Sequence, residues 1–386
     1  MTTLGLEGLL QDVRRIQGAH TYGTVAHVGA GLIQLEGIGQ NAKLGDQINL
    51  RARSGERMGG EVISLSKGAT IVQPDTGLTG ISLGDEALLG GPLEISPSDS
   101  WIGRVIDANG AALDGQYLPR GEQPRSILGT PPNPTKRRAL GERIETAMSI
   151  FNTLLPIVKG QRLGLFAGSG VGKSSLLAHF ASHMHADVIV IALIGERGRE
   201  LRQFVESTLG KRGMARSVIV AATSDQSPLL RRRCALTAMS VAEHFRDQGK
   251  HVLLLADSIT RLAEAHREIA LSAGENPALR GYPASTSHLL MSLCERAGPG
   301  IDGTGDITAL FSVLVAGSDM DEPIADMMRG VLDGHVVLDR AIAERGRYPA
   351  IDAVRSVSRS LPDAADDREN ALISTARRLL GSYDEN

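Results

Sequence analysis

The sequence has few aromatic residues and almost no cysteine. Aromatic residues make up 3% of its 386 positions, and only one of them is tryptophan. Proteins that bind single-stranded nucleic acid stack its bases on aromatic side chains, so a dedicated surface of that kind is not expected. The two cysteines, Cys234 and Cys294, lie far apart and fit no metal-binding spacing. We expect both to be reduced and buried, as is usual in the cytoplasm.

Long apolar runs and a surplus of one charge are also missing. No stretch approaches the ~20 apolar residues that span a bilayer, and the start, MTTLGLEGLLQDVRR, lacks the features of a signal peptide. The chain has 41 basic and 44 acidic residues, for a net charge of −3. This balance argues against a dedicated nucleic-acid binder. The sequence therefore predicts a cytoplasmic protein whose membrane contacts are made through partners.

Four segments differ in their residue patterns. Residues 1–20 repeat apolar positions at helical spacing and predict an amphipathic helix that binds a partner, or that docks on its own domain. Residues 21–92 form short alternating stretches separated by glycines, which predict a small β-barrel. Residues 93–355 alternate continuous apolar runs with helical patterns, as in a mostly parallel sheet covered on both faces. Residues 356–386 predict a turn and a helix.

A glycine-rich loop lies between a strand and a helix in RLGLFAGSGVGKSSLL, residues 162–177. It matches the phosphate-binding loop, with Ala167 in place of the first glycine. Glycines allow backbone N–H groups to point at phosphate oxygens, and the following helix adds its positive end. Lys173 would reach the β- and γ-phosphates, and Ser174 would bind Mg²⁺. The expected nucleotide contacts are Ala167, Gly168, Ser169, Gly170, Val171, Gly172, Lys173, Ser174 and Ser175.

Charged residues follow two other apolar runs. HVLLLADSITR places Asp257 at a strand end, where we expect it to hold Mg²⁺ directly or through water. IALIGERGRE places Glu196 where it could polarise the attacking water, and Arg197 where it could tether Glu196 or the γ-phosphate. Glu200, about one helical turn further on, is expected to contact a metal-bound water. Parallel strands open at the same edge of a sheet, so these groups should face the phosphate loop.

The strings FAGSGVGKSSLL, ALIGERGRELRQF, AATSDQSPLLRRRCALTA, AEHFRDQGKHVLLLADSITR, EPIADMMRGVLDGHVVLDR and RYPAIDAVRSVSR run through the chain. Together they resemble the ATPases of type III protein export, and most of all the flagellar export ATPase. These proteins are similar to the catalytic subunits of rotary ATP synthases. The resemblance implies an α/β fold with a RecA-like P-loop NTPase core and a mostly parallel sheet. A small N-terminal β-barrel would precede this core, and a short, truncated α-helical segment would follow it.

The resemblance also implies how the protein works. The family forms a homo-hexameric ring with ATP and Mg²⁺ at each subunit interface. Glu196 matches its catalytic base, Arg359 matches an arginine that enters the neighbour's site, and Tyr348 matches a tyrosine that lies against adenine. The implied partners are an export regulator, a central stalk protein, the membrane proteins of the export gate and chaperone–cargo complexes, with no nucleic acid. The implied location is the cytoplasmic side of the inner-membrane export apparatus.

Two departures from the family pattern leave alternatives open. Asn152 stands where the family usually has an acid, which we expect to alter only a local hydrogen bond. The sequence ends at Asn386 within a helical pattern, so we expect most of the family's C-terminal helical domain to be absent. A virulence secretion ATPase and a nucleotide-binding regulatory subunit without turnover therefore stay open. A ring-shaped RNA translocase is disfavoured, because the only arginine triplet, Arg231–Arg233, lies within the core pattern.

Overall fold

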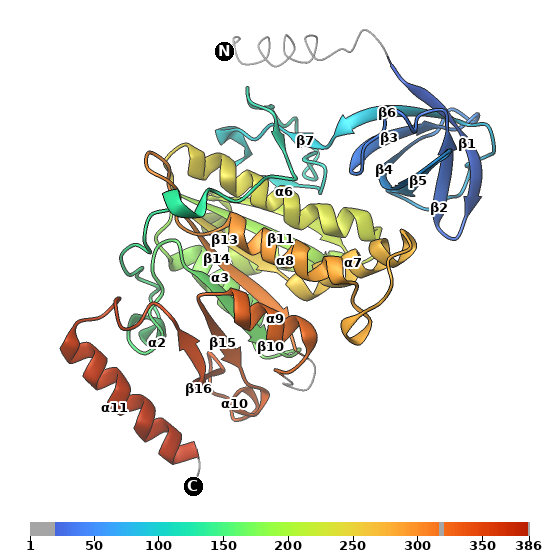
Figure 1. Ribbon diagram of the computed structural model, residues 1–386. Helices are drawn as coiled ribbons and strands as arrows, with labels where there is room; N and C mark the ends of the chain where they lie inside the picture. The colour runs from blue at the N-terminus through green and yellow to red at the C-terminus, as the bar shows by residue number, and fades with distance from the viewer. Residues whose placement is uncertain (1–19, 316–319, 385–386) are drawn as a thin grey trace.

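The computed structural model describes residues 20–315 and 320–384, and it shows a barrel beside a larger sheet-and-helix core (Figure 1). The helix expected over residues 1–20 lies outside the described residues except for its last position. Among the described residues, no helix is both long and apolar enough to cross a bilayer.

The first domain is a closed antiparallel barrel with the strand order β1-β2-β5-β4-β3-β6. Alternate residues such as Val25, Ile33 and Val72 point inward and are almost fully buried, as the period of two in the sequence predicts. The small N-terminal β-barrel of the predicted fold is therefore confirmed. Its strands are β1 (Tyr22–Gly29), β2 (Leu32–Glu36), β3 (Asp46–Arg51), β4 (Arg57–Ser66), β5 (Ala69–Pro74) and β6 (Glu86–Pro92).

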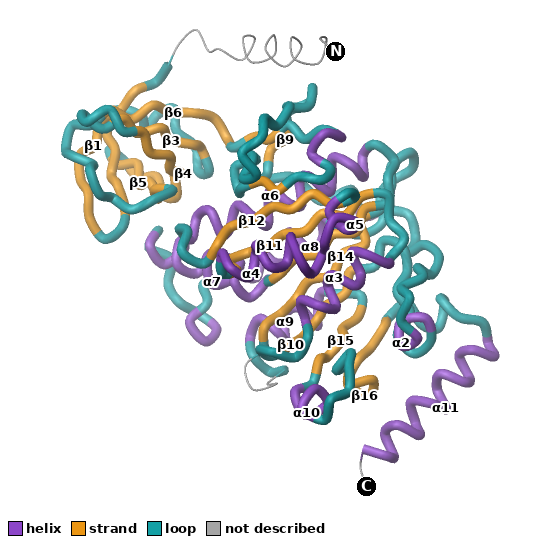
Figure 2. The backbone as a smooth tube through the Cα atoms, turned by 180° about the vertical axis from the view of Figure 1, so that it is seen from behind, coloured by secondary structure: helices purple, strands orange, loops and turns teal. Residues whose placement is uncertain are grey.

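The core contains an eight-stranded sheet in the order β16-β15-β10-β14-β13-β11-β12-β8 (Figure 2). Neighbouring strands are parallel, except that β16 is antiparallel to β15. The central strands are continuous runs of valine, isoleucine, leucine and alanine, as expected of strands buried on both faces. The strands are β8 (Val105–Ile106), β10 (Arg162–Ala167), β11 (Val188–Glu196), β12 (Ser217–Thr223), β13 (Val252–Asp257), β14 (Ile307–Leu314), β15 (Gly334–Leu338) and β16 (Ile351–Ser358).

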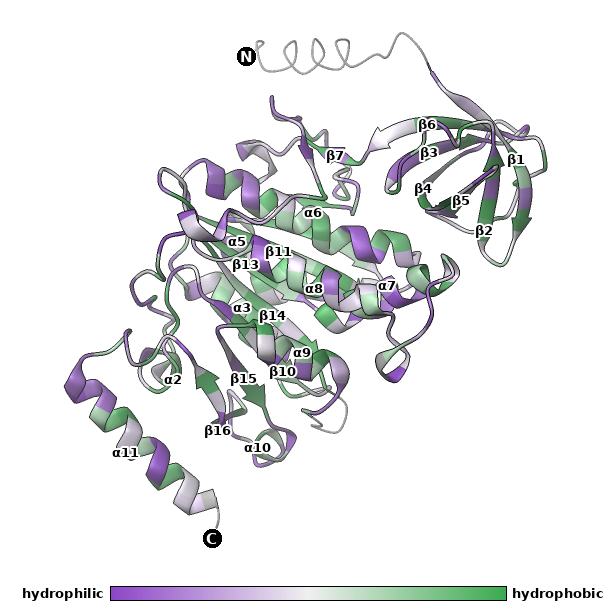
Figure 3. Ribbon diagram, viewed as in Figure 1, coloured by the Kyte–Doolittle hydropathy of each residue, from purple (hydrophilic) through white to green (hydrophobic). Residues whose placement is uncertain are grey.

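Helices cover both faces of this sheet, and hydrophobic residues concentrate on the strands between them (Figure 3). The predicted two-sided α/β core is confirmed. One face carries α6 (Pro228–Asp247), α7 (Ile259–Ser272), α8 (Ala284–Arg296) and α9 (Pro323–Val331). The other carries α3 (Lys173–His183), α4 (Gly198–Gln203), a π-helical turn (Phe204–Leu209) and α5 (Gly210–Met214). Cys234 and Cys294 are free and buried, as expected.

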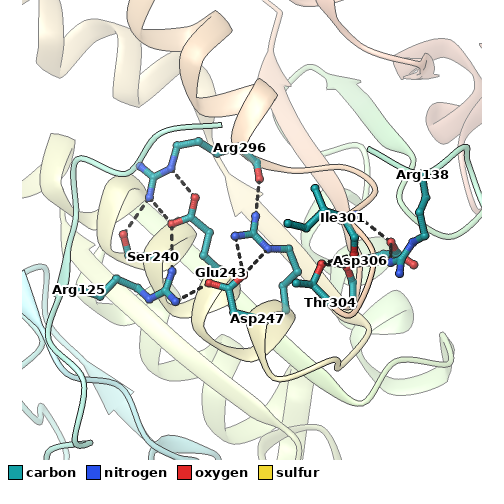
Figure 4. Close-up of polar contacts among 12 residues, drawn as sticks. Arg125, Arg138, Ser240, Glu243, Asp247, Arg296, Ile301, Thr304 and Asp306 are labelled. Carbon is teal, nitrogen blue, oxygen red and sulfur yellow. Dashed lines mark hydrogen bonds and ion pairs between the residues drawn. The ribbon is translucent and has the colours of Figure 1, made fainter. Parts of the chain in front are cut away.

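A buried ion pair between α8 and α6 also holds the segment that connects barrel and core (Figure 4). Arg296 Nη2 lies 2.7 Å from Glu243 Oε2, and both side chains are at most 3% exposed. Arg296 Nη1 also donates to the Ile127 carbonyl at 2.8 Å. Each charge is therefore paired, which a buried charge requires. The connection consists of β7 (Glu94–Ile95) paired with β9 (Arg125–Ser126), the short helices Asp99–Trp101 and Pro134–Lys136, and α2 (Ser149–Asn152).

Two arginines of the triplet, Arg232 and Arg233, join the core to the barrel. Arg233, on α6, is 1% exposed and donates to Glu61 at 3.0 Å and to Asp75 at 2.9 Å, both on the barrel side of the contact. Arg232 also pairs with Glu61. Burial raises the pKa of Asp75, and the charge of Arg233 opposes that rise. These arginines are therefore held in an interdomain contact.

The last strand of the sheet was not anticipated. β16 follows α10 (Arg340–Glu344) and crosses the boundary expected between residues 355 and 356. Its last residues belong to the sheet instead of a helical segment. The helix expected near the end is α11 (Asp367–Asp384), which Arg377 ties to the Ser356 carbonyl at 3.0 Å.

Candidate active site

The phosphate loop joins the end of β10 at Ala167 to the start of α3 at Lys173. Gly170 and Gly172 have φ angles of 79° and 90°, which glycine adopts without a side-chain clash. No side chain caps the amino end of α3. The N–H groups of its first turn therefore have no capping partner, and they can bind an anion.

A cavity of about 830 Å³ opens over this loop. A smaller cavity of about 250 Å³ shares Ser174 and Glu196 with it and is also lined by Asp257. Val171 instead is buried in the core. The structure thus brings the loop, Glu196 and Asp257 to one region. The expected residues that line the larger cavity are Ala167, Gly168, Ser169, Gly170, Gly172, Lys173, Ser174, Ser175, Glu196 and Glu200.

Glu196 reaches this region through an irregularity at the end of β11. The pairing of β11 with β12 shifts between Ile194 and Glu196, and Gly195 between them has a φ of 69°. A Cβ atom on Gly195 would lie 3.1 Å from Arg261 Cδ. Glycine at this position therefore allows both the turn of the backbone and the close approach of Arg261.

The surroundings of Glu196 suit a general base. Burial raises the pKa of its carboxyl group from 4.5 to about 7, and the nearby charge of Asp257 adds to the rise. Lys173 and Arg261 oppose it. Arg261 Nε lies 3.5 Å from Glu196 Oε1, and Arg261 Nη1 donates to the Gly195 carbonyl at 2.6 Å. A base with a pKa near neutrality can accept a proton from water at physiological pH.

Asp257 receives two donors on one oxygen. Lys173 Nζ pairs with Asp257 Oδ1, and Ser312 Oγ donates to the same atom at 2.7 Å. Asp257 ends β13, and Ser312 lies on β14, between β13 and the strand that leads to the phosphate loop. The aspartate therefore ends the strand on one side of β14, and the loop that carries Lys173 follows the strand on its other side.

Tyr348 lies against the phosphate loop. A Cβ atom on Gly172 would be 3.5 Å from both Cδ1 and Cε1 of the Tyr348 ring. The ring is 62% exposed, so one side of it is open to solvent. This position suits a ring that stacks on a base whose phosphates lie in the loop.

Two expected catalytic arginines lie away from the cavities. Arg197 is 76% exposed and pairs with Glu200 at 3.3 Å. Arg261, and not Arg197, lies beside Glu196. Arg359 follows β16, whose end pairs with the beginning of β15. This is the amino edge of the parallel strands, opposite the phosphate loop. Arg359 therefore does not reach the site of its own subunit.

Asn152 makes local contacts outside both cavities. Its Oδ1 accepts from Thr146 Oγ1 at 2.9 Å, and its amide donates to Glu145. An acid at this position would lack that amide donor.

Comparison with known proteins agrees with this geometry. A family model described as the ATP synthase alpha/beta family, nucleotide-binding domain, matches residues 147–358. The chain belongs to the ATP synthase alpha/beta family. The flagellum-specific ATP synthase of Agrobacterium fabrum is 44% identical over 94% of this chain and 76% of its own length. That of Caulobacter vibrioides is 42% identical over 98% of this chain and 87% of its own length.

A solved structure of a type III secretion ATPase shares the fold. The assembled ATPase EscN, from the type III secretion system of enteropathogenic E. coli, superposes with a TM-score of 0.86. It is 35% identical in sequence and covers 94% of this chain and 87% of its own. The resemblance to export ATPases and the predicted fold are confirmed. Family membership and the phosphate loop identify the chain as an ATP-binding protein of the ATPase type.

The oxygen donors at the smaller cavity fit Mg²⁺. Within residues 20–315 and 320–384, no cluster of three or more His, Cys, Asp or Glu side chains could hold a metal by itself. Ser174, Asp257 and Glu200 line this cavity and present oxygen atoms. Mg²⁺ usually takes only one or two ligands from a protein and the rest from phosphates and water. The donor set of this ATP synthase alpha/beta family member therefore suits a metal bound together with its nucleotide.

Two polar residues of the site, Arg261 and Ser312, were not predicted from the sequence. Arg261 follows Asp257 by about one helical turn in DSITR, a spacing that was visible in the sequence. Ser312 lies inside the apolar run DITALFSVLVAG and gave no separate signal. The larger cavity is also lined by Thr260, Glu264, Arg280, Tyr282, Leu314, Val315, Glu322, Pro323 and Ile324.

Proposed function

We propose that this chain hydrolyses ATP to power protein export by the flagellar type III secretion apparatus, as a homo-hexameric ring. The observation that carries the proposal is the convergence of Lys173, Glu196 and Asp257 on adjoining cavities. Relatives over nearly the whole chain are named flagellum-specific ATP synthases, which favours the flagellar system. Two solved type III secretion ATPases from pathogenic bacteria have lower identities, 35% and 39%.

Nucleotide binding would use the phosphate loop and the side chains beside it. The cavity of about 830 Å³ is large enough for a nucleotide. Backbone N–H groups of the loop and the first turn of α3 would hold the phosphates, and Lys173 would contact the β- and γ-phosphates. Tyr348 would lie against the adenine. Ser174 and Asp257 would hold Mg²⁺, directly or through water, and Glu200 would contact a water bound to it.

Hydrolysis requires a base and a means of stabilising negative charge. Glu196 would accept a proton from the attacking water, because burial keeps its pKa near 7. Arg261 holds the Gly195 carbonyl and lies beside Glu196, so it would fix the direction of the carboxylate. Lys173 would stabilise the charge that develops on the γ-phosphate. Bound Mg²⁺ would neutralise charge on the phosphate oxygens. Arg197 would join the site only by leaving Glu200.

A second subunit completes the proposed site. Arg359 lies at the edge of the sheet opposite the phosphate loop, so it would act in the cavity of a neighbouring copy. An arginine supplied by a neighbour can raise turnover by about 10³–10⁵-fold. A head-to-tail contact of this kind closes into a ring. A regulatory subunit without turnover would not need Glu196, and this chain retains it.

The relatives also suggest partners for the ring. EscN has been solved in complex with its central stalk, EscO. We therefore propose a central stalk protein for this chain, together with an export regulator, membrane proteins of the export gate and chaperone–cargo complexes. Its proposed location is the cytoplasmic side of the inner-membrane export apparatus.

The test is ATPase activity measured across protein concentration. Activity should rise more than linearly through the assembly range, since each site needs Arg359 of a neighbour. Arg359→Ala should lose at least about 10³-fold in turnover while keeping ATP affinity. The exposed Arg340→Ala, which only breaks a surface pair with Glu344, is the matched control. Strict proportionality between activity and concentration, or full activity of Arg359→Ala, would contradict the proposed arrangement.

A further inference from the structure

The carboxylate of Asp257 accepts a hydrogen bond from a side chain on β14, a strand that does not lead into the phosphate loop. Ser312 Oγ donates to Asp257 Oδ1 at 2.7 Å. Ser312 is completely buried, and its strand, β14, lies between β10 and β13. The serine therefore occupies a fixed position between the loop strand and the aspartate strand.

The two donors to Asp257 Oδ1 differ in how free they are to move. Lys173 Nζ belongs to a flexible side chain whose ammonium group is also required at the phosphates under the proposed function. The side chain of Ser312 is short and lies on a central strand, so it has little freedom to move. Its hydroxyl donates to Asp257. The terminal torsion of an aspartate is soft, so its carboxylate needs a fixed donor to hold one orientation. The serine is the donor that can supply it.

The hydrogen bonds also determine which oxygen of the Asp257 carboxylate is free to bind a metal ion or a water molecule. Oδ1 accepts from both Lys173 and Ser312, which uses the two acceptor positions of that oxygen. The described part of the chain provides no hydrogen-bond donor to Oδ2. Asp257 lines the smaller cavity beside Ser174. With Oδ1 fixed, Oδ2 is the oxygen available to Mg²⁺ or to a water bound to it.

We propose that Ser312 is a positioning residue that orients the Asp257 carboxylate toward magnesium-bound nucleotide. It acts through Asp257 and does not itself touch the nucleotide. The inference rests on the proposed function, because it takes the cavity to be a site for ATP with Mg²⁺. Residues that orient a metal-binding group in this way commonly change metal affinity by about 10–100-fold when they are removed.

The same strand provides a matched control. Thr308 is the other polar residue of β14 that is fully buried. Its hydroxyl accepts from the Gly160 N–H at 2.9 Å and contacts His251 Nε2 at 2.8 Å, at the amino end of the strand. Thr308→Val removes a hydroxyl that is as buried as that of Ser312 but makes no contact with Asp257. It therefore reports the general effect of disturbing β14.

The experiment is calorimetric titration of the full-length protein with ATP, once with Mg²⁺ and once with EDTA. Ser312→Ala should weaken ATP binding with Mg²⁺ by about 10–100-fold. Binding in EDTA should stay within about twofold of wild type, because the loop contacts are unchanged. Ser312→Thr keeps a hydroxyl and should restore the Mg²⁺-dependent affinity. Thr308→Val should retain wild-type affinity in both buffers.

A second variant protects the test against a folding defect. If Ser312→Ala does not fold, Ser312→Cys carries the same expectation, since a thiol has similar size but donates weakly. The inference is overturned if the serine variants keep the wild-type effect of Mg²⁺, or if Thr308→Val loses it equally. A wild-type protein that binds no ATP in either buffer would instead overturn the proposed function, and the inference with it.

Discussion

Glu196 should make the folded protein less stable as the pH rises, and Glu196→Gln should remove that effect. Burial places the folded-state pKa of Glu196 at about 7, compared with 4.5 for a solvated carboxyl group. The folded chain therefore binds this proton more tightly than the unfolded chain does. Its stabilising effect is fully present below pH 4.5 and is lost as the pH rises to about 7. Above that pH, the carboxylate is an unfavourable charge in the folded state.

The size of the effect follows from the same two pKa values. The interval between 4.5 and about 7 corresponds to about 3 kcal/mol at roughly 1.4 kcal/mol per pH unit. This is an upper bound, because the side chain retains 15% exposure to water. Glutamine has similar shape and no charge to lose. At pH 8.5, Glu196→Gln should therefore unfold up to about 4 °C above wild type, at roughly 0.8 kcal/mol per kelvin for a chain of this length.

The assay is thermal unfolding of wild type and variant between pH 5 and 8.5. The two melting curves should nearly coincide at the acid end and separate through neutrality. Glu206→Gln is the control, because Glu206 is 58% exposed and its pair with Arg202 is screened by solvent. A separation that is constant with pH would refute the reasoning. So would a Glu196→Gln variant less stable than wild type at pH 8.5.

Three further predictions concern catalysis, base recognition and domain contact. Turnover should rise about tenfold per pH unit up to about pH 7 and then level off, because only ionised Glu196 accepts a proton; a flat pH–rate profile would exclude it. Tyr348→Ala should weaken ATP binding about tenfold in calorimetric titration, and Tyr348→Phe should preserve it, since ring stacking is the expected contact. Arg233→Met should lower the free energy of unfolding in urea by about 3 kcal/mol, because it leaves Asp75 without its buried partner and Glu61 with Arg232 alone; an unchanged denaturation midpoint would contradict this.

The site residues that the sequence predicted share one property. Glu196 and Asp257 end apolar strands, and Lys173 follows one through the glycine loop, so their place at the carboxyl edge follows from the order of strand and helix. Ser312 lies within a strand, and a single hydroxyl in an apolar run does not show which neighbour it meets. Its role depends on β14 lying beside β13, which is a property of the sheet.

Arg197 shows the limit of reasoning from adjacent residues. Its place next to Glu196 suggested that it would hold the glutamate. In the structure, Arg197 precedes the first residue of α4 and pairs with Glu200, and Arg261 reaches Glu196 from α7. The position of Arg261 depends on the left-handed backbone at Gly195, which allows its stem to approach. The spacing of Arg197 and Glu200 in the sequence indicates their contact. The contact between Arg261 and Glu196 depends on how α7 packs against the end of β11.

β16 was not predicted because its residues show only a weak strand pattern. The sequence IDAVRSVS alternates buried residues with exposed ones irregularly, and it includes the charged residues Asp352 and Arg355. Without a continuous apolar run, a short strand of this kind is not distinguished from a loop. Its antiparallel direction is also a property of the assembled sheet, since it depends on pairing with β15.

Because β16 runs antiparallel to its neighbour, each copy of the chain presents Arg359 at one edge of its sheet and the phosphate loop at the opposite edge. Under the proposed function, a copy with a defective base can still donate its arginine, and a copy without the arginine can still use its base. Two inactive variants, Glu196→Gln and Arg359→Ala, would then complement each other when mixed, with about a quarter of randomly formed interfaces competent. The strand thereby makes catalytic competence a property of the contact between two chains and not of either chain alone.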